Sequence, residues 1–150
     1  MRLIAHRGNV NGPDRSAENS LDYIDTAIGL AYDVEVDLRR ESGEFYLGHD
    51  GPEYHVLMEW LVERKNNLWI HCKDFASLEF LSECDVDFNY FWHDTDDHTL
   101  TSKGYIWSYP GQPHSSNSIV VLPENIETFN FSDCDYDCYG ICSDYVGRIL

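Results

Sequence analysis

Residues 33–39, Asp-Val-Glu-Val-Asp-Leu-Arg, alternate charged and apolar side chains with a period of two. This alternation predicts a β-strand, because successive side chains of a strand point to opposite faces. It puts Glu35 and Asp37 on one face, roughly 6.5–7 Å apart along the backbone. Two carboxylates at this spacing repel each other unless they converge on one cation. The stretch itself leaves two interpretations open, a cation site or an exposed strand with a polar face.

A second short strand is predicted at the N-terminus. Residues 3–5, Leu-Ile-Ala, form an apolar run that leads directly into His6, Arg7 and Gly8, and a polar loop follows over residues 9–17. Such a strand brings a titratable imidazole, a cation able to bind phosphate and a flexible residue to one edge of a sheet.

Four short motifs then follow one another along the first third of the chain: His6-Arg7-Gly8, Glu18-Asn19, Glu35-x-Asp37 and His49-Asp50. In this order and spacing they resemble the glycerophosphodiester phosphodiesterase family. Beyond residue 50 the resemblance is thinner, and it rests on an Ile-x-x-Lys strand at residues 70–73 and a last strand within residues 140–145.

The resemblance implies metal-dependent hydrolysis of a glycerophosphodiester, or a similar small phosphodiester, to an alcohol and a phosphomonoester. By position, it implies acid/base catalysis by His6 and His49, phosphate binding by Arg7 and Lys73, metal binding by Glu35 and Asp37, and support from Glu18 and Asn19. Each histidine taken alone could equally be a structural residue, and Glu18 could simply begin a surface helix. A non-catalytic protein that binds a phosphorylated ligand on the same scaffold is the alternative function.

One position departs from the family pattern. The family carries an acidic metal ligand two residues before the strand lysine, and here that residue is His71. His71 is therefore a further candidate ligand. The expected cofactor is a divalent cation, Mg²⁺ or Ca²⁺, with Mn²⁺ or Zn²⁺ as alternatives because imidazole nitrogen favours softer ions. A weaker site, another carboxylate in place of the missing one, or a loss of activity are the other outcomes.

Helical periodicity is found only before residue 85. A helix is expected after Asn19, which is a candidate cap, and further helices are expected over residues 56–65 and 76–83. Strands are expected over residues 45–48, 68–73, 88–93, 104–109, 118–122 and 140–143. Because a TIM-type (β/α) barrel needs about 250 residues, the resemblance implies a reduced or incomplete barrel. We expect an α/β fold in which residues 1–150 form one domain with helices mainly in the first half.

Aromatic and histidine residues near the predicted strand ends leave alternatives open. Trp92, Trp107 and Tyr109 are expected in the core, but they could also wall a glycerol-sized pocket. His93 followed by Asp94 could form a further metal pair, although a structural role is the simpler interpretation.

Charge and composition exclude several classes of partner. The chain has 10 Lys and Arg against 27 Asp and Glu, a net charge of −17. This charge disfavours nucleic acids and anionic lipid surfaces. The small phosphodiester that the resemblance implies as partner is also anionic, so local cations or a metal would have to reverse the charge at the site. No stretch approaches the roughly 20 apolar residues of a membrane span. The N-terminus has no signal-peptide pattern, so a cytoplasmic location is expected.

The chain has 5 cysteines, an odd number. Cys134, Cys138 and Cys142 do not have the paired Cys-x-x-Cys spacing of zinc sites. Reduced thiols are expected, and the spacing of these three residues suggests no function.

Overall fold

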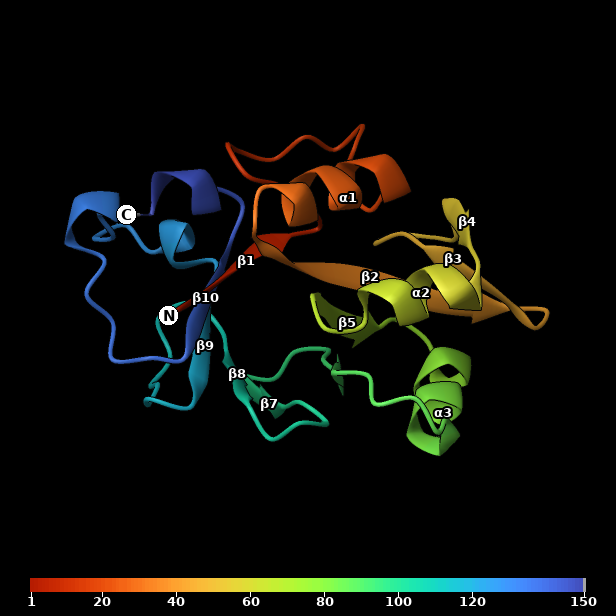
Figure 1. Cartoon of the computed structure of the whole chain (residues 1–150). Coiled ribbons are helices and arrows are strands. Elements are labelled where there is room, and N and C mark those ends of the chain that lie inside the picture. The colour runs from red at the N-terminus through yellow and green to blue at the C-terminus, as the bar shows by residue number, and fades with distance from the viewer. Residues whose placement is uncertain (150) are drawn as a thin grey trace.

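The framework of the computed structural model, which describes residues 1–149, is one curled sheet of 10 strands (Figure 1). The helices and strands follow in this order: β1 (Arg2–His6), α1 (Leu21–Gly29), β2 (Asp33–Glu41), β3 (Glu44–Leu47), β4 (Tyr54–Val56), α2 (Met58–Arg64), β5 (Leu68–Cys72), α3 (Phe75–Glu83), β6 (Tyr90–Trp92), β7 (His98–Leu100), β8 (Ile106–Ser108), β9 (Ser118–Val121) and β10 (Gly140–Ser143). Three short 3₁₀ turns, Pro123–Asn125, Phe131–Asp133 and Val146–Arg148, lie in the second half.

The sheet is mixed, with a parallel centre and antiparallel additions. The parallel strands are hydrogen-bonded in the order β6-β5-β2-β1-β10-β9-β8. The β2-β3-β4 meander and the β7-β8 pair add the antiparallel strands. Within residues 1–149 no ladder joins β6 to β8, so the sheet curls into a half-barrel and stays open.

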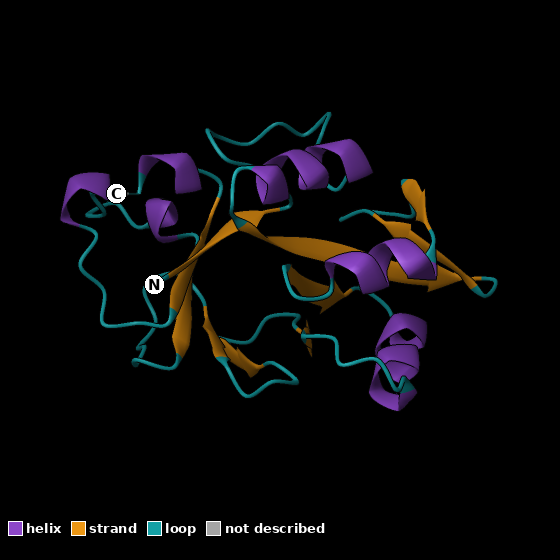
Figure 2. Cartoon of the chain, viewed as in Figure 1, coloured by secondary structure: helices purple, strands orange, loops and turns teal. Residues whose placement is uncertain are grey.

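The expected α/β fold, a reduced or incomplete TIM-type (β/α) barrel, is therefore wrong, because the structure is a half-barrel dominated by its mixed sheet. The described chain has only three α-helices beside ten strands, and residues 86–149 have strands but no α-helix (Figure 2). The helices do lie before residue 85, but the strands of the second half are joined by loops and 3₁₀ turns. The physical reason lies in these connections, which carry Pro110, Gly111, Pro113 and Pro123 where a crossover helix would need an uninterrupted hydrogen-bonded turn.

Strand β2 lies at the centre of the sheet. Residues 33–38 are all buried, so the interpretation of this stretch as an exposed strand is wrong. Its end turns back into β3 through Ser42 and Gly43, whose φ angles of 52° and 81° are left-handed. A two-residue loop with two positive φ angles suits the twist of a hairpin, and glycine adopts it without strain.

Two details of the predicted elements differ from the structure. Asn19 does not cap a helix, because Ser20 occupies the position before α1. The short strands β4 and β7 were not predicted, since three residues carry too little periodicity to be recognised.

Three apolar clusters pack against the sheet within residues 1–149, and the smallest consists of Val120, Ile141 and Ile149. The largest cluster packs the helices against the sheet and includes Ile24, Leu38 and Leu61. The inner cluster lies inside the curl and is rich in aromatic residues, with Trp69, Phe91 and Trp107 at its centre. The curled interior is therefore filled, and polar groups gather only beyond the inner cluster.

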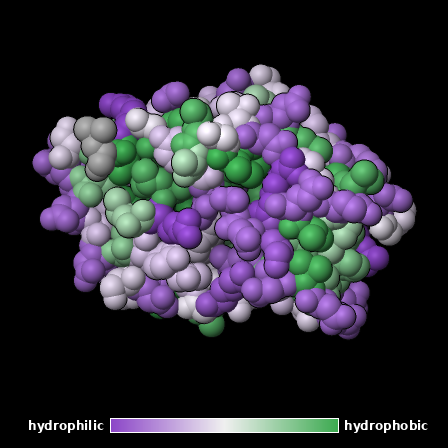
Figure 3. All heavy atoms as spheres, in the orientation of Figure 1, coloured by the Kyte–Doolittle hydropathy of each residue, from purple (hydrophilic) through white to green (hydrophobic). Residues whose placement is uncertain are grey.

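The surface reflects the acidic composition. Figure 3 shows hydrophilic residues over much of one face, with apolar residues in separate patches between them. Among residues 1–149, no helix has both the length and the apolar composition required to cross a membrane. All five cysteines carry free thiols.

Candidate metal and phosphate site

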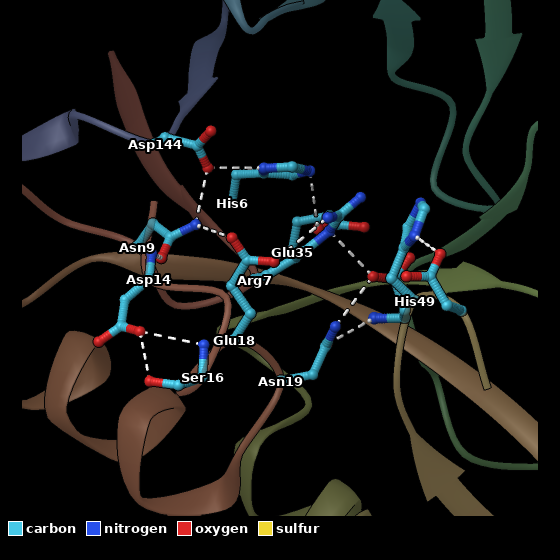
Figure 4. A network of polar contacts seen from close by, with 12 residues as sticks. His6, Arg7, Asn9, Asp14, Ser16, Glu18, Asn19, Glu35, His49 and Asp144 are labelled. Carbon is cyan, nitrogen blue, oxygen red and sulfur yellow. Dashed lines mark hydrogen bonds and ion pairs between the residues drawn. The ribbon is translucent and has the colours of Figure 1, made fainter. Parts of the chain in front are cut away.

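Side chains from β1, β2 and β5 meet inside the curl, toward the carboxyl ends of the strands. The sheet register pairs His6 with Glu35 and Asp37 with His71. Neighbouring residues in a ladder project to the same face, so all four side chains point inward. Figure 4 shows His6 and Glu35 directed toward each other within the polar network.

Glu35, Asp37 and His71 form a group that could hold a metal ion. One ligand atom from each lies within 4.8 Å of the others. Glu35 and Asp37 are 1% and 0% exposed, and Glu35 Oε2 and Asp37 Oδ1 have no hydrogen-bond partner in the described chain. Buried carboxylate oxygens without partners are costly. Of these two oxygens, Asp37 Oδ1 lies beside the His71 imidazole and Glu35 Oε2 beside that of His6. The group therefore fits a cation, and its donor set is mixed oxygen and nitrogen.

The orientation of His71 supports this fit. Its Nε2 lies 3.2 Å from the backbone carbonyl of His93, and a carbonyl only accepts, so Nε2 donates. Nδ1 is then left facing Asp37 Oδ1 at 3.3 Å and Glu35 Oε1 at 3.7 Å. A histidine ligand whose other nitrogen donates to a carbonyl is the usual arrangement at metal sites.

Without a cation, a proton on His71 balances the carboxylates. Burial by itself would lower the pKa of His71, but Asp37 and Glu35 raise it to about 9. Burial would likewise raise the pKa of Asp37, yet His71 and Arg7 hold it well below its usual range. A proton and a metal ion would therefore compete for His71 Nδ1, and a bound metal ion would displace the proton.

Arg7 and Asn19 surround Asp37 from the other side. Arg7 Nε lies 3.1 Å from Asp37 Oδ2, and Arg7 Nη1 donates to Glu18 at 3.3 Å. Asn19 donates to Asp37 Oδ2 at 2.9 Å and accepts from the Asp37 backbone N–H at 3.0 Å. Arg7 and Asn19 both have left-handed backbones, with φ of 55° and 63°. Such strained conformations persist where surrounding contacts hold them, which occurs often at functional sites.

His6 is held by a residue that the sequence analysis did not identify. His6 Nδ1 lies 2.7 Å from Asp144 Oδ1, just past β10, and His6 Nε2 lies 3.9 Å from Glu35 Oε2. Asn9 bridges the network by donating to Asp144 at 2.8 Å and to Glu18 at 2.9 Å (Figure 4). Burial opposes protonation of His6, but Asp144 and Glu35 raise its pKa. Asp144 could have been suspected from one signal, its position directly after the last parallel strand.

His49 and Lys73 reach the same site from its rim. A cavity of about 250 Å³ is lined by residues that include His6, Arg7, Glu35, His49, His71 and Lys73. The Arg39 guanidinium donates to the Gly48 carbonyl at 2.9 Å and also to the His49 carbonyl, which anchors the loop that carries the imidazole. The His49 side chain is 41% exposed, and its Nδ1 contacts Asp50 at 2.7 Å.

A second cavity of about 200 Å³ adjoins the first and shares Arg7 and His49 with it. Glu18 and Asn19, the residues expected to support the site, lie in its wall together with Arg15. The structure thus brings all the site residues named from the sequence to two adjoining cavities or to the buried group between them.

Aromatic residues of the second half close the first cavity. Trp107 and Tyr109 line it, whereas Trp92 is not among its lining residues. The His93 ring stacks on Tyr109 with 3.6 Å between ring centroids. His93 and Asp94 line the cavity, but they are not part of the metal-binding group found among residues 1–149. Trp107 and Tyr109 therefore pack against other aromatic side chains and also line the cavity.

Comparison with family models, curated proteins and solved structures finds no match to this chain. The resemblance to glycerophosphodiester phosphodiesterases accordingly rests on the sequence motifs alone.

Proposed function

We propose that this chain is a metal-dependent phosphodiesterase that hydrolyses a small phosphodiester, of the glycerophosphodiester type, to an alcohol and a phosphomonoester. The observation that carries the proposal is the composition of one cavity wall. Two imidazoles, His6 and His49, share that wall with the cations Arg7 and Lys73, next to the buried Glu35, Asp37 and His71 group.

His6 is suited to proton transfer at Nε2. Its Nδ1 contact with Asp144 directs the other nitrogen toward the cavity, in the manner of a carboxylate that orients a catalytic imidazole. A raised pKa keeps more of the imidazole protonated near neutral pH, which suits the donation of a proton to the leaving alcohol oxygen. From the exposed side, His49 takes a proton from the attacking water, whose oxygen forms the new bond to phosphorus as the bond to the alcohol oxygen breaks.

Lys73 and Arg7 bind the phosphoryl oxygens. Lys73 has no ion pair within residues 1–149, so its charge is available to a ligand. A divalent cation held by Glu35, Asp37 and His71 would neutralise further negative charge on the same oxygens. Such positive groups also offset the net charge of −17, which would otherwise repel an anionic substrate.

The test is turnover of glycerophosphocholine and of bis(p-nitrophenyl) phosphate after chelation and after addition of Mg²⁺, Ca²⁺, Mn²⁺ or Zn²⁺. We expect hydrolysis that depends on the added ion and that His6→Ala removes. His55→Ala is the matched control, because His55 is an exposed histidine paired with Glu44. Absence of turnover with every ion would contradict the proposal.

The uncommitted charge of Lys73 also supports the alternative function, a non-catalytic protein that binds a phosphorylated ligand. Binding of phosphate or of a phosphomonoester without hydrolysis of either diester, lost in Lys73→Ala, would favour that alternative.

A further inference from the structure

The curled sheet has a third polar cavity, which lies at the opposite end of its strands from the first two. It has a volume of about 270 Å³ and is lined by residues at or just before the starts of several strands. They include Arg2, Asp33, Trp69, Asn89, Tyr105 and Tyr139. This volume lies just below the roughly 300–1,000 Å³ of ligand pockets, so it suits a molecule of metabolite size.

Two tryptophans separate this cavity from the metal and phosphate site. Trp107 lines the cavity at the carboxyl ends of the strands, and Trp69 lines the cavity at the amino ends. Their ring centroids are 5.8 Å apart, and Phe91 stacks on Trp107 from the side at 4.6 Å. The two cavities therefore face opposite ways from one aromatic layer and have no lining residue in common.

The cavity at the amino ends is positively charged although the chain is strongly acidic. Arg2, Lys65 and Lys103 line it, against the single lining carboxylate of Asp33. Asp33 already accepts from Trp69 Nε1 and from Asn67 Nδ2, each at 3.2 Å, and lies 3.7 Å from Arg2. The negative charge of Asp33 is thus largely compensated by groups of the protein itself.

The positive charges of Lys65 and Lys103 are little compensated by carboxylates of the protein. Lys103 contacts Asp87 at 3.0 Å, but the Asp87 side chain is 78% exposed, and exposed pairs of this kind are weak. Lys65 has no ion pair among residues 1–149. An excess of cations around one cavity, in a chain with net charge −17, indicates an anionic ligand.

A buried amide gives a second, independent indication. Asn89 is 6% exposed, and within the described residues its Oδ1 has no hydrogen-bond partner. A buried acceptor left without a donor is destabilising, because it has lost its hydrogen bond to water. Because Asn89 lines the cavity, a ligand that carries a donor group would satisfy it.

The remaining wall is aromatic and suits a flat ligand. Tyr105 lies 4.3 Å from Tyr139 and 5.3 Å from Trp69, measured between ring centroids. Aromatic pairs at such separations are stabilised by offset or edge contacts, and a further planar ring can extend the group.

We propose that this cavity binds a small aromatic carboxylate that carries a hydrogen-bond donor. Its carboxylate lies toward Arg2, Lys65 and Lys103, its ring contacts the aromatic wall, and its donor reaches Asn89. This site is distinct from the phosphodiesterase site and requires neither metal nor turnover.

The probe is 4-hydroxybenzoate, titrated calorimetrically into the whole, metal-free protein. We expect one molecule bound per chain, with at least fivefold weaker binding of 4-hydroxybenzyl alcohol, which lacks the charge, and of benzoate, which lacks the donor. The indole N–H signal of Trp69, assigned with Trp69→Phe, is expected to shift on binding.

Variants locate the binding. Lys65→Ala combined with Lys103→Ala is expected to weaken 4-hydroxybenzoate binding at least tenfold, because two cations are lost from the cavity. Asn89→Leu is expected to remove the preference for 4-hydroxybenzoate over benzoate. Lys73→Ala is the matched lysine control at the opposite cavity, and its binding is expected to equal that of the wild type.

The proposal is overturned by three results. These are no saturable binding, equal binding by the wild type and the double lysine variant, or binding that Lys73→Ala alone removes. Since no turnover is measured, failure here leaves the proposed phosphodiesterase activity unaffected, and failure of that activity leaves this site unaffected.

Discussion

Residues 1–85 reach each new parallel strand through a helix, α1, α2 or α3, whereas residues 86–149 join their strands through loops and 3₁₀ turns. Both halves nevertheless contribute parallel strands to one sheet, and both deliver side chains to its carboxyl-end rim. The first half supplies the charged groups, such as Glu35 and Asp37. The second half supplies groups that orient or enclose them, such as Asp144 and Tyr109. A crossover helix is therefore not required to bring a side chain to the site, because the strand alone determines where the chain reaches the rim.

The largest effect is expected from replacing Asp37, a buried carboxylate of the first half. Asp37→Ala leaves Arg7 and His71 without their shared carboxylate, so we expect a loss of about 3–5 kcal/mol in the free energy of unfolding and no metal-dependent turnover. Urea denaturation and diester hydrolysis measure the two effects. Asp50→Ala, which removes an exposed carboxylate, is the stability control, and equal stability of both variants would contradict the role of Asp37.

The contact between Asp144 of the second half and His6 of the first half tests whether Asp144 contributes to catalysis by orienting His6. We expect His6→Ala to lower kcat about 10²–10⁴-fold, and Asp144→Asn to lower it about 10–100-fold. His49→Ala is expected to match His6→Ala, and the double histidine variant adds little because the two groups act together.

A purely structural role of Asp144 predicts no change in the pH profile. Because burial opposes protonation of His6 while Asp144 favours it, loss of the Asp144 charge lowers the pKa of His6. The limb of the pH–kcat/KM profile governed by His6 is then expected to move to lower pH in Asp144→Asn. An unmoved limb would exclude Asp144 as the orienting residue.

The charge balance around His71 predicts a pH-dependent stability of the metal-free protein. The pKa of His71 in the folded protein, about 9, lies above its ordinary value of 6.5. The stabilisation from protonated His71 is therefore fully present below pH 6.5 and is lost as pH rises through 9. The shift corresponds to about 3 kcal/mol at most. Urea denaturation at several pH values, with chelator present, compares the wild type with His71→Gln. A wild-type free energy that falls no more steeply than that of the variant would contradict this assignment.

His71 is also expected to influence which ion the proposed metal site prefers. A neutral imidazole favours Mn²⁺ or Zn²⁺ over Ca²⁺, whereas a third carboxylate adds the charge and oxygen that Ca²⁺ favours. We expect His71→Glu to tighten Ca²⁺ binding roughly tenfold and to reduce the loss of affinity at low pH. Calorimetric titration at two pH values measures both effects. Equal Ca²⁺ affinity in the two forms would show that His71 is not a ligand.

The smallest effect concerns a helix of the first half that lies away from the chemistry. Gly29 is the last residue of α1, its φ is not positive, and an added Cβ meets nothing within 4 Å. Gly29→Ala is therefore expected to raise the free energy of unfolding by up to about 1 kcal/mol, with turnover unchanged. Thermal denaturation of this variant beside the wild type measures the change, and a destabilisation would show that the helix end needs glycine.

Much of the candidate site could be predicted because its residues lie in short local patterns. The alternation in residues 33–39 predicts that Glu35 and Asp37 share a face, and the structure has them so within β2. The apolar run before His6 predicts a strand that ends at that residue, as β1 does. Asn19 was predicted as a helix cap, and only the fold reveals its contact with Asp37. Its left-handed backbone turns it away from the helix and into the site.

The sequence by itself determined the strands that carry His6, Glu35, Asp37 and His71, because the period of apolar residues is a local property of the chain. Only the tertiary structure decided that the sheet stays open, that Asp144 holds His6 across 138 positions, and that a charged cavity forms at the amino ends of the strands. These features depend on the order and curl of strands that are distant along the chain. No local pattern encodes that order, because each pairing is selected by the packing of the whole sheet.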